Sequence, residues 1–202
     1  MDKYTLISIV DDDAEARQAL RLLLETANFA VKEYNCATAF LDDDVFEPSC
    51  LIADLVMPAM DGLALQSEVN RRRRDLPVII VSGFGEVDLA VQAMKAGAVD
   101  FLEKPVEPDT FLTSVYRALS IGEKARELVT QNKAARKLVS ALTPREKNVM
   151  DELVAGLSNK AVAEKLGISP RTVEVYRAQI MNKLNADSMS DLVRTALAAS
   201  TM

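Results

Sequence analysis

The sequence predicts an α/β fold with a doubly wound, five-stranded parallel sheet, followed by a small all-α domain. Two observations lead to this prediction. In residues 1–120, five short segments rich in valine and isoleucine alternate with longer segments of helical periodicity, and crossovers of that length join parallel strands whose two faces are covered by helices. From residue 142 onward no strand pattern appears, and turns that contain proline or glycine separate helical segments.

Short sequence patterns define the elements of the first region. We expect strands at TLISIV (5–10), AVKEY (30–34), SCLIAD (49–54), PVIIVS (77–82) and VDFLE (99–103). After the first strand, EARQALRLLLETA places leucines and alanines on one helical stripe. In VDLAVQAMKAG a second stripe, made of Val87, Ala90, Val91 and Met94, precedes a C-cap signal at Gly97. Each of these helices therefore has one apolar face.

Residues 107–142 are expected to form one long helix that contains a single glycine, Gly122. Within it a seam with alternating spacings of four and three consists of Ile121, Ala125, Leu128, Asn132, Ala135, Val139 and Leu142. The seam fits either a coiled coil between two chains or a linker helix that packs on its own domain, and both interpretations stay open. We therefore expect one domain at 1–120, a helical linker at 121–141 and a second domain at 142–202.

Composition limits the functional classes. Apolar residues make up 49% of the 202 residues, enough for packed cores, and no apolar run approaches the roughly 20 residues of a membrane helix. The absence of histidine excludes His-ligated zinc and a Ser-His-Asp triad, and Cys36 and Cys50 are too few for a disulfide framework. The N-terminal TLISIV is a poor signal peptide, so we expect a cytoplasmic protein without a membrane partner.

Charge is divided unevenly along the chain. Residues 1–120 contain 11 basic and 21 acidic residues, a net charge of −10, whereas residues 121–202 contain 13 and 9, a net charge of +4. This asymmetry indicates two domains with different partners, and an anionic polymer suits the second.

Polar residues stand where four of the expected strands end. Asp11 and Asp12 follow the first strand, Asp54 ends the third, Ser82 ends the fourth and Lys104 follows the fifth. The carboxyl ends of parallel strands meet at one edge, where doubly wound sheets bind ligands. Crowded carboxylates without histidine or thiolate suit Mg²⁺ or Mn²⁺. Asp54 is then the expected nucleophile toward a phosphoryl group, with Lys104 neutralising and Ser82 hydrogen-bonding the transferred oxygens.

Residues 1–120 resemble the receiver domains of bacterial two-component response regulators, which have the CheY-like fold. The matching motifs are VDDD, DLVMPAMDG and SGFGEVDLAVQAMKAGAVDFLEKP. The resemblance implies Mg²⁺ held by Asp11 or Asp12, by Asp54 and by the backbone carbonyl of Val56. It also implies phosphorylation of Asp54 by a partner sensor histidine kinase.

The same resemblance implies a conformational switch. Ser82 would move toward the phosphoryl group and Phe101 would follow it inward, although Phe101 also fits an ordinary core position. Phosphorylation is then expected to produce a homodimer. The expected dimer face presents Val91, Lys95, Asp100 and Arg117.

The second region contains a helix-turn-helix pattern. In LSNKAVAEKLGISPRTVEVYRAQIMNKL, a turn with Gly167 separates two helices, and the second begins at Ser169-Pro170. The side chains expected to face the core on the second helix are Val173, Ile180, Met181 and Leu184. Its other face carries basic, small and hydroxyl side chains, which suit a DNA major groove.

Residues 142–202 resemble LuxR-type DNA-binding domains of the FixJ/NarL subfamily, and the match runs through most of this region. The resemblance implies base contacts by Glu174, Val175 and Ala178. The implied phosphate contacts come from Lys160, Arg171, Thr172, Arg177 and Lys183. Residues 143–202 contain 8 basic and 7 acidic residues, so we expect modest non-specific affinity and a need for dimerisation.

Together these patterns predict a transcription factor that phosphorylation activates, with promoter DNA and RNA polymerase as partners, and not a turnover enzyme. Three alternatives stay open: a Mg²⁺-dependent aspartyl-phosphate phosphatase, a regulator that needs no phosphorylation, and a promoter reader of the sigma-factor type. The run Arg71–Arg74 is interpreted either as a solvated helix end or as a docking or DNA-backbone patch.

Overall fold

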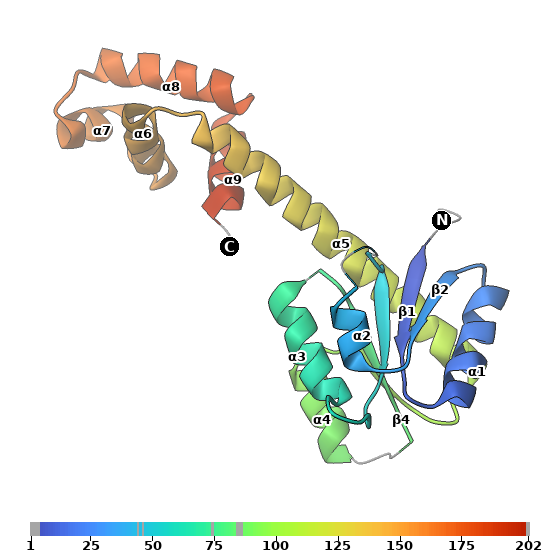
Figure 1. Ribbon diagram of the computed structural model, residues 1–202. Coiled ribbons are helices and arrows are strands. Elements are labelled where there is room, and N and C mark those ends of the chain that lie inside the picture. The colour runs from blue at the N-terminus through green and yellow to red at the C-terminus, as the bar shows by residue number, and fades with distance from the viewer. Residues whose placement is uncertain (1–4, 44, 46, 74, 84–86, 201–202) are drawn as a thin grey trace. The chain divides into compact units, whose positions relative to one another are not determined.

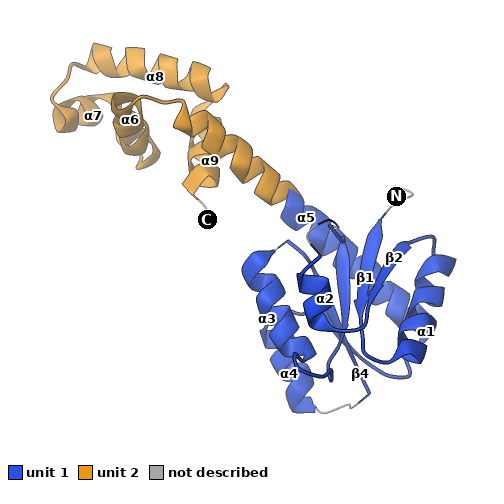
Figure 2. Cartoon of the chain, viewed as in Figure 1, with its two compact units in different colours: residues 1–126 blue, residues 127–202 orange. Residues whose placement is uncertain are grey.

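The computed structural model describes residues 5–200 except 44, 46, 74 and 84–86. The chain divides into two compact units, residues 1–126 and residues 127–202, which are blue and orange in Figure 2. Helix α5 (Pro108–Ser140) contributes residues to both units, and residues 121–140 of the predicted linker at 121–141 belong to it.

The first unit is built on a parallel sheet with the strand order β2-β1-β3-β4-β5, which confirms the predicted α/β fold. The strand order changes direction at the neighbours β1 and β3, so the loops that follow them leave a crevice at the carboxyl edge. Its elements are β1 (Leu6–Val10), α1 (Ala14–Thr26), β2 (Ala30–Tyr34), α2 (Ala37–Leu41), β3 (Cys50–Asp54), α3 (Gly62–Arg72), β4 (Val78–Ser82), α4 (Val87–Lys95), β5 (Asp100–Glu103) and the first part of α5.

Helices cover both faces of the sheet, as Figure 1 shows for α1 on one side and for α2, α3 and α4 on the other. Because successive strand side chains point to opposite faces, each strand contributes to two apolar clusters. Ile7, Ile9 and Ile52 pack with α1 and α5, whereas Leu51 and Ile80 pack with the other helices. The central strands β3 and β4 are buried along their whole length, and the predicted polar residues lie at the carboxyl edge of the sheet.

Cys50 is fully buried within the α1–α5 cluster, and burial raises the pKa of its thiol to about 12. This placement leaves the thiol protonated at neutral pH.

Helix α4 turns its predicted apolar stripe to solvent. Val87, Val91 and Met94 are exposed by 74%, 44% and 47%, and Ala93 is the buried residue of this helix. The small Ala93 side chain allows close packing, and the amide of Gln66 on α3 donates a hydrogen bond to the Ala93 carbonyl over 3.1 Å. The stripe therefore forms a surface beside β5, not part of the core.

The predicted seam of α5 divides into two parts. In the second unit, Ala135 and Leu142 are buried, and Val139 packs against the same apolar cluster. In the first unit, Ile121 is exposed by 47%, and Leu128 just beyond it is exposed by 56%. The interpretation that the helix packs on its own domain therefore holds for the C-terminal half of the seam.

The second unit is all-α, as predicted. Beyond the end of α5 it contains α6 (Pro144–Val154), α7 (Asn159–Leu166), α8 (Pro170–Leu184) and α9 (Met189–Ser200). Thr143, Ser158 and Ser169 cap the first three helices through their hydroxyl oxygens, and Pro144 and Pro170 occupy the first helical positions. Among the described residues, no helix combines the length and the apolar composition needed to cross a bilayer.

Candidate functional site

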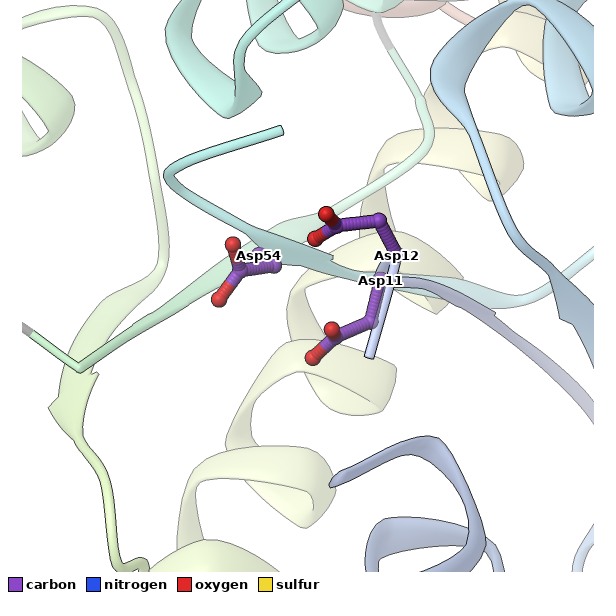
Figure 3. A group of neighbouring side chains, drawn as sticks. All are labelled: Asp11, Asp12 and Asp54. Atoms are coloured by element: carbon purple, nitrogen blue, oxygen red, sulfur yellow. The ribbon is translucent and has the colours of Figure 1, made fainter. Parts of the chain in front are cut away.

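The strand register brings the predicted site residues to one edge of the sheet. Val10, the last residue of β1, pairs with Ala53, so Asp11 comes level with Asp54 at the end of β3. Figure 3 shows the side chains of Asp11, Asp12 and Asp54 as near neighbours. Carboxylate oxygens of these three residues lie within 4.8 Å of one another.

Lys104 joins the two buried carboxylates. Its Nζ donates hydrogen bonds to Asp11 Oδ2 over 2.6 Å and to Asp54 Oδ1 over 2.5 Å, and the side chains of the two acids are exposed by only 1% and 7%. Burial raises the pKa of the Asp54 carboxyl, and the charge on Asp11 adds to this effect against the opposing hydrogen bond from Lys104. Burial would lower the pKa of Lys104, but its two carboxylate partners raise it.

The charges of this site are unbalanced. Three carboxylates and one ammonium leave a net charge of −2, and among the described residues the exposed Asp12 side chain makes no hydrogen bond or ion pair to compensate it. A divalent cation has the charge that would balance the site, and an all-oxygen donor set suits Mg²⁺. The residues present therefore fit the predicted metal, while Asp13 is used elsewhere, as the N-cap of α1.

The loop after β3 is shaped around Asp54. The Val56 N–H donates to Asp54 Oδ2 over 2.9 Å, and the Gly62 N–H donates to the Leu55 carbonyl over 2.9 Å. A Cβ on Gly62 would lie 2.4 Å from the Asp54 carbonyl oxygen, closer than side chains approach backbone. Glycine at the end of DLVMPAMDG is therefore required by space.

Ser82 and Phe101 lie on neighbouring strands. Ser82 is fully buried at the end of β4, and Asp54 pairs with the preceding residue, Val81. The Lys104 N–H donates to the Ser82 carbonyl over 2.7 Å, which ties the lysine loop to β4. Phe101 is partly buried and packs against the cluster on the α2–α3–α4 side of the sheet.

In the second unit, α7 and α8 form the predicted helix-turn-helix. Gly167 between them has a left-handed φ of 68°, which favours glycine. On α8, Val173, Ile180 and Leu184 are buried, and Met181 is partly buried. The predicted DNA-contacting face is accessible: Lys160, Arg171, Glu174, Val175, Ala178 and Lys183 are exposed, and Thr172 and Arg177 are intermediate.

The two units match two families of known domains. Residues 7–116 match the response regulator receiver domain, and residues 140–196 match the bacterial regulatory proteins of the luxR family. The chain belongs to the two-component response regulators with a LuxR-type DNA-binding domain. The first unit is thus a receiver domain and the second a LuxR-type domain.

Relatives with this organisation cover nearly the whole chain. The chain is 46% identical to the transcriptional regulatory protein FixJ of Bradyrhizobium diazoefficiens over 96% of its length and 95% of that protein. It is 42% identical to FixJ of Rhizobium meliloti, over 98% and 97% of the two lengths. Among solved structures, the response regulator StyR matches with a TM-score of 0.78 and 35% identity over 97% of this chain and 99% of that one. Full-length FixJ from B. japonicum matches with a TM-score of 0.58 and 42% identity, over 98% of each chain.

Two of the predicted dimer residues, Asp100 and Arg117, already pair with each other within the chain. Arg117 lies 2.5 Å from Asp100 Oδ2 and also donates to the Val99 carbonyl over 3.0 Å, while Ser114 donates to the same Asp100 carboxylate. Lys95 is exposed at the end of α4, beside the exposed Val91.

Lys183 of the LuxR-type domain also has a partner that the sequence pattern did not reveal. Its Nζ donates to Glu146 Oε2 over 2.7 Å, and the same oxygen accepts the N–H of Thr143 at the start of α6. The capping-box spacing of Thr143 and Glu146 is visible in the sequence, but the link to Lys183 is not.

The described arginines of the run pair with local acids. Arg71 and Arg72 bind Glu68 over 2.7 and 2.5 Å, Arg73 lies 3.5 Å from Asp75, and Arg74 lies outside the described residues. These contacts favour the interpretation of a solvated helix end for the described part of the run.

Proposed function

We propose that this response regulator is a transcription factor that a sensor histidine kinase switches on by transferring a phosphoryl group to Asp54. The observation that carries the proposal is the unbalanced acidic site. Two buried carboxylates, Asp11 and Asp54, share the single ammonium of Lys104, and the unpaired Asp12 lies beside them. An ion pair that only stabilises the fold would need one carboxylate for the Lys104 ammonium, not three.

In this proposal Mg²⁺, or Mn²⁺ as a substitute, is held by the carboxylates of Asp11, Asp12 and Asp54 and by the backbone carbonyl of Val56. The metal supplies neutralisation of the phosphoryl oxygens when it is bound. The Asp54 oxygen attacks phosphorus, an O–P bond forms as the N–P bond of the kinase phosphohistidine breaks, and the imidazole nitrogen keeps the electron pair. Lys104 then pairs with the phosphoryl oxygens in place of the Asp54 carboxylate, and Ser82 donates its hydroxyl to them. The receiver thus assists its own phosphorylation without being a turnover enzyme.

Activation is proposed to proceed through Ser82 and Phe101 to the surface made by α4 and β5. A shift from about 1% to about 99% active requires roughly 5.5 kcal/mol, whereas one hydrogen bond to a charged group supplies only about 1.5–3 kcal/mol. A homodimer contact therefore has to contribute. The exposed stripe with Val91 and Lys95 supports this surface, and the intrachain pair of Asp100 and Arg117 would have to exchange partners.

The LuxR-type domain is proposed to read promoter DNA through α8, with RNA polymerase as a further partner and the cytoplasm as the location. Glu174, Val175 and Ala178 face the bases in this proposal. The phosphate contacts come from Lys160, Arg171, Thr172, Arg177 and Lys183.

The test compares metal-loaded protein with and without beryllofluoride, which mimics the Asp54 phosphoryl group. Analytical ultracentrifugation should show a rising dimer fraction over micromolar concentrations, and binding to selected DNA sites should tighten in parallel. An unchanged monomer fraction with rising DNA affinity would exclude the dimer step. If neither the affinity for DNA nor the dimer fraction changes, the phosphorylation switch itself is excluded.

A further inference from the structure

Arg17 on α1 reaches back to the acidic loop, a contact that no sequence pattern indicated. Its Nη1 donates a hydrogen bond to the backbone carbonyl of Asp11 over 2.6 Å, and its side chain is exposed by only 16%. Its Nε lies 3.9 Å from Oε1 of Glu33 on β2, so the guanidinium lies between the loop and the neighbouring strand.

The Asp11 residue is held on several sides. Its N–H donates to the Tyr34 carbonyl over 3.2 Å, its Oδ1 accepts the Asp13 N–H over 2.9 Å, and its Oδ2 accepts Lys104. The carbonyl bound by Arg17 belongs to the peptide group that joins Asp11 to Asp12. Arg17 therefore fixes the orientation of the peptide plane from which the otherwise unpaired Asp12 projects.

We propose that Arg17 is a positioning residue for the cation site, which orients Asp11 and Asp12 without touching the metal. This inference rests on the proposed Mg²⁺ site. Groups that hold metal ligands by hydrogen bonds commonly change metal affinity by about 10–100-fold when they are replaced.

The loss of the Arg17 charge and the loss of its hydrogen bond should change the affinity for Mg²⁺ in opposite directions. Arg17→Gln removes a positive charge close to a cation site, so electrostatics alone would leave Mg²⁺ binding tighter. Loss of the bond to the Asp11 carbonyl would instead let the Asp11–Asp12 peptide turn and weaken binding. The sign of the change therefore separates the two effects.

Arg21 provides a matched control on the same helix. It binds Glu33 over 3.1 Å and Glu25 over 2.8 Å, and its side chain is exposed by 47%. Among the described residues it has no bond to the 11–13 loop. Arg21→Gln changes the net charge by the same amount but leaves the Asp11 carbonyl held.

The experiment is isothermal titration of the full chain with MgCl₂, for the wild type, Arg17→Gln, Arg21→Gln and Arg17→Lys, with thermal unfolding recorded for each. We expect roughly tenfold weaker binding for Arg17→Gln, a change within twofold for Arg21→Gln, and an intermediate loss for Arg17→Lys, which keeps the charge but lacks the planar fork.

Arg17→Gln binding Mg²⁺ as tightly as the wild type, or more tightly, would overturn the inference while leaving the metal site intact. If Arg17→Gln does not fold, wild-type affinity in Arg17→Lys would overturn it equally. A wild type that binds no Mg²⁺ would remove the proposed site itself and the inference with it.

Discussion

Each domain contains a buried carboxylate bound to a lysine, and the two centres differ in stoichiometry. In the receiver, Lys104 serves both Asp11 and Asp54. In the LuxR-type domain, Lys183 serves Glu146 alone, over 2.7 Å, and the Glu146 side chain is exposed by only 4%. The hydrogen bond from Lys183 lowers the pKa of Glu146, whereas burial raises the pKa of Asp54.

Burial alone therefore does not mark a reactive carboxylate. Glu146 and Asp54 are similarly buried, yet Glu146 also accepts the N–H of Thr143 and completes a helix cap, so its charge is fully used by the fold. Asp54 has more carboxylate neighbours than cations around it. The surplus negative charge favours a ligand that brings positive charge.

The two carboxylates should differ most in their ability to accept a phosphoryl group. With acetyl phosphate and Mg²⁺, we expect Asp54→Asn to abolish the gain of one phosphoryl mass, because Asp54 is the proposed phosphoacceptor. Glu146→Gln should be phosphorylated like the wild type. Intact-protein mass spectrometry measures both.

Removing Mg²⁺ with EDTA should give the same loss in the wild type. Stoichiometric phosphorylation of Asp54→Asn would show that Asp54 is not the phosphoacceptor and that the surplus negative charge does not mark the reactive carboxylate.

The sequence predicted the receiver site better than its supporting contacts. Asp11, Asp54, Ser82 and Lys104 could be found because parallel strands end at one edge, so a residue's position at a strand end is enough to place it. Arg17 could not be found in this way, since its bond to the Asp11 carbonyl depends on the direction of a long side chain. Backbone acceptors leave no pattern of residue types.

The helical regions show a second limit of sequence reasoning. A spacing of four and three residues fits a coiled coil and also fits a helix packed in a small core. In α5 the same seam is buried at Ala135 and Leu142 and exposed at Leu128. Likewise, Arg117 and Asp100 have suitable charges for a contact between chains, but proximity within one chain already pairs them.

The second prediction concerns two glycines that serve the two sites for different reasons. Gly62→Ala should destabilise the receiver by about 1–3 kcal/mol, because its Cβ would overlap the Asp54 carbonyl. Gly167→Ala should cost about 1 kcal/mol, because open space surrounds it and only its φ of 68° is unfavourable.

Gly83→Ala is the matched control, since a Cβ there meets nothing within 4 Å. Urea unfolding of the full chain followed by hydrogen exchange assigns each loss to its domain. A neutral Gly62→Ala would mean that the loop around Asp54 is adaptable, contrary to the geometry of this site.

The third prediction separates the two kinds of DNA contact proposed for α8. Arg177→Ala should weaken binding to all sequences and reduce the salt slope by about 1 if it contacts a phosphate. Glu174→Lys should instead change the preferred site, with discrimination of about 1–3 kcal/mol at the altered base pair. Binding titrations over a salt series and selection from random DNA measure these effects, and identical preferred sites for Glu174→Lys and the wild type would exclude base reading by Glu174.

The fourth prediction has the smallest effect: neutralising the two carboxylates should change the stability of the two domains in opposite directions. In metal-free buffer at pH 7, Asp54→Asn should stabilise the receiver by on the order of 1 kcal/mol, because the fold disfavours the charged carboxyl. Glu146→Gln should destabilise the LuxR-type domain and lower its Tm by roughly 4–8 °C, because a helix-cap bond and the Lys183 pair are weakened.

Acidification should bring both differences toward zero from opposite sides. Protonation of wild-type Asp54 begins at its raised pKa, so the advantage of Asp54→Asn is lost as the pH falls from there to its ordinary value near 3.8. The pKa of Glu146 is lowered, so the stability it contributes is complete above its ordinary value of 4.5 and is lost progressively as the pH falls from there through the lowered pKa. Calorimetry of the full chain over this pH range, with hydrogen exchange at pH 7 to assign the domains, measures both curves.

Added Mg²⁺ should stabilise the wild type and so reduce or reverse the advantage of Asp54→Asn, because the cation binds the folded charged site. Two differences of the same sign at pH 7 would show that the crowded carboxylates of the receiver are as well compensated as the single one in the LuxR-type domain, and the electrostatic argument for the metal site would fail.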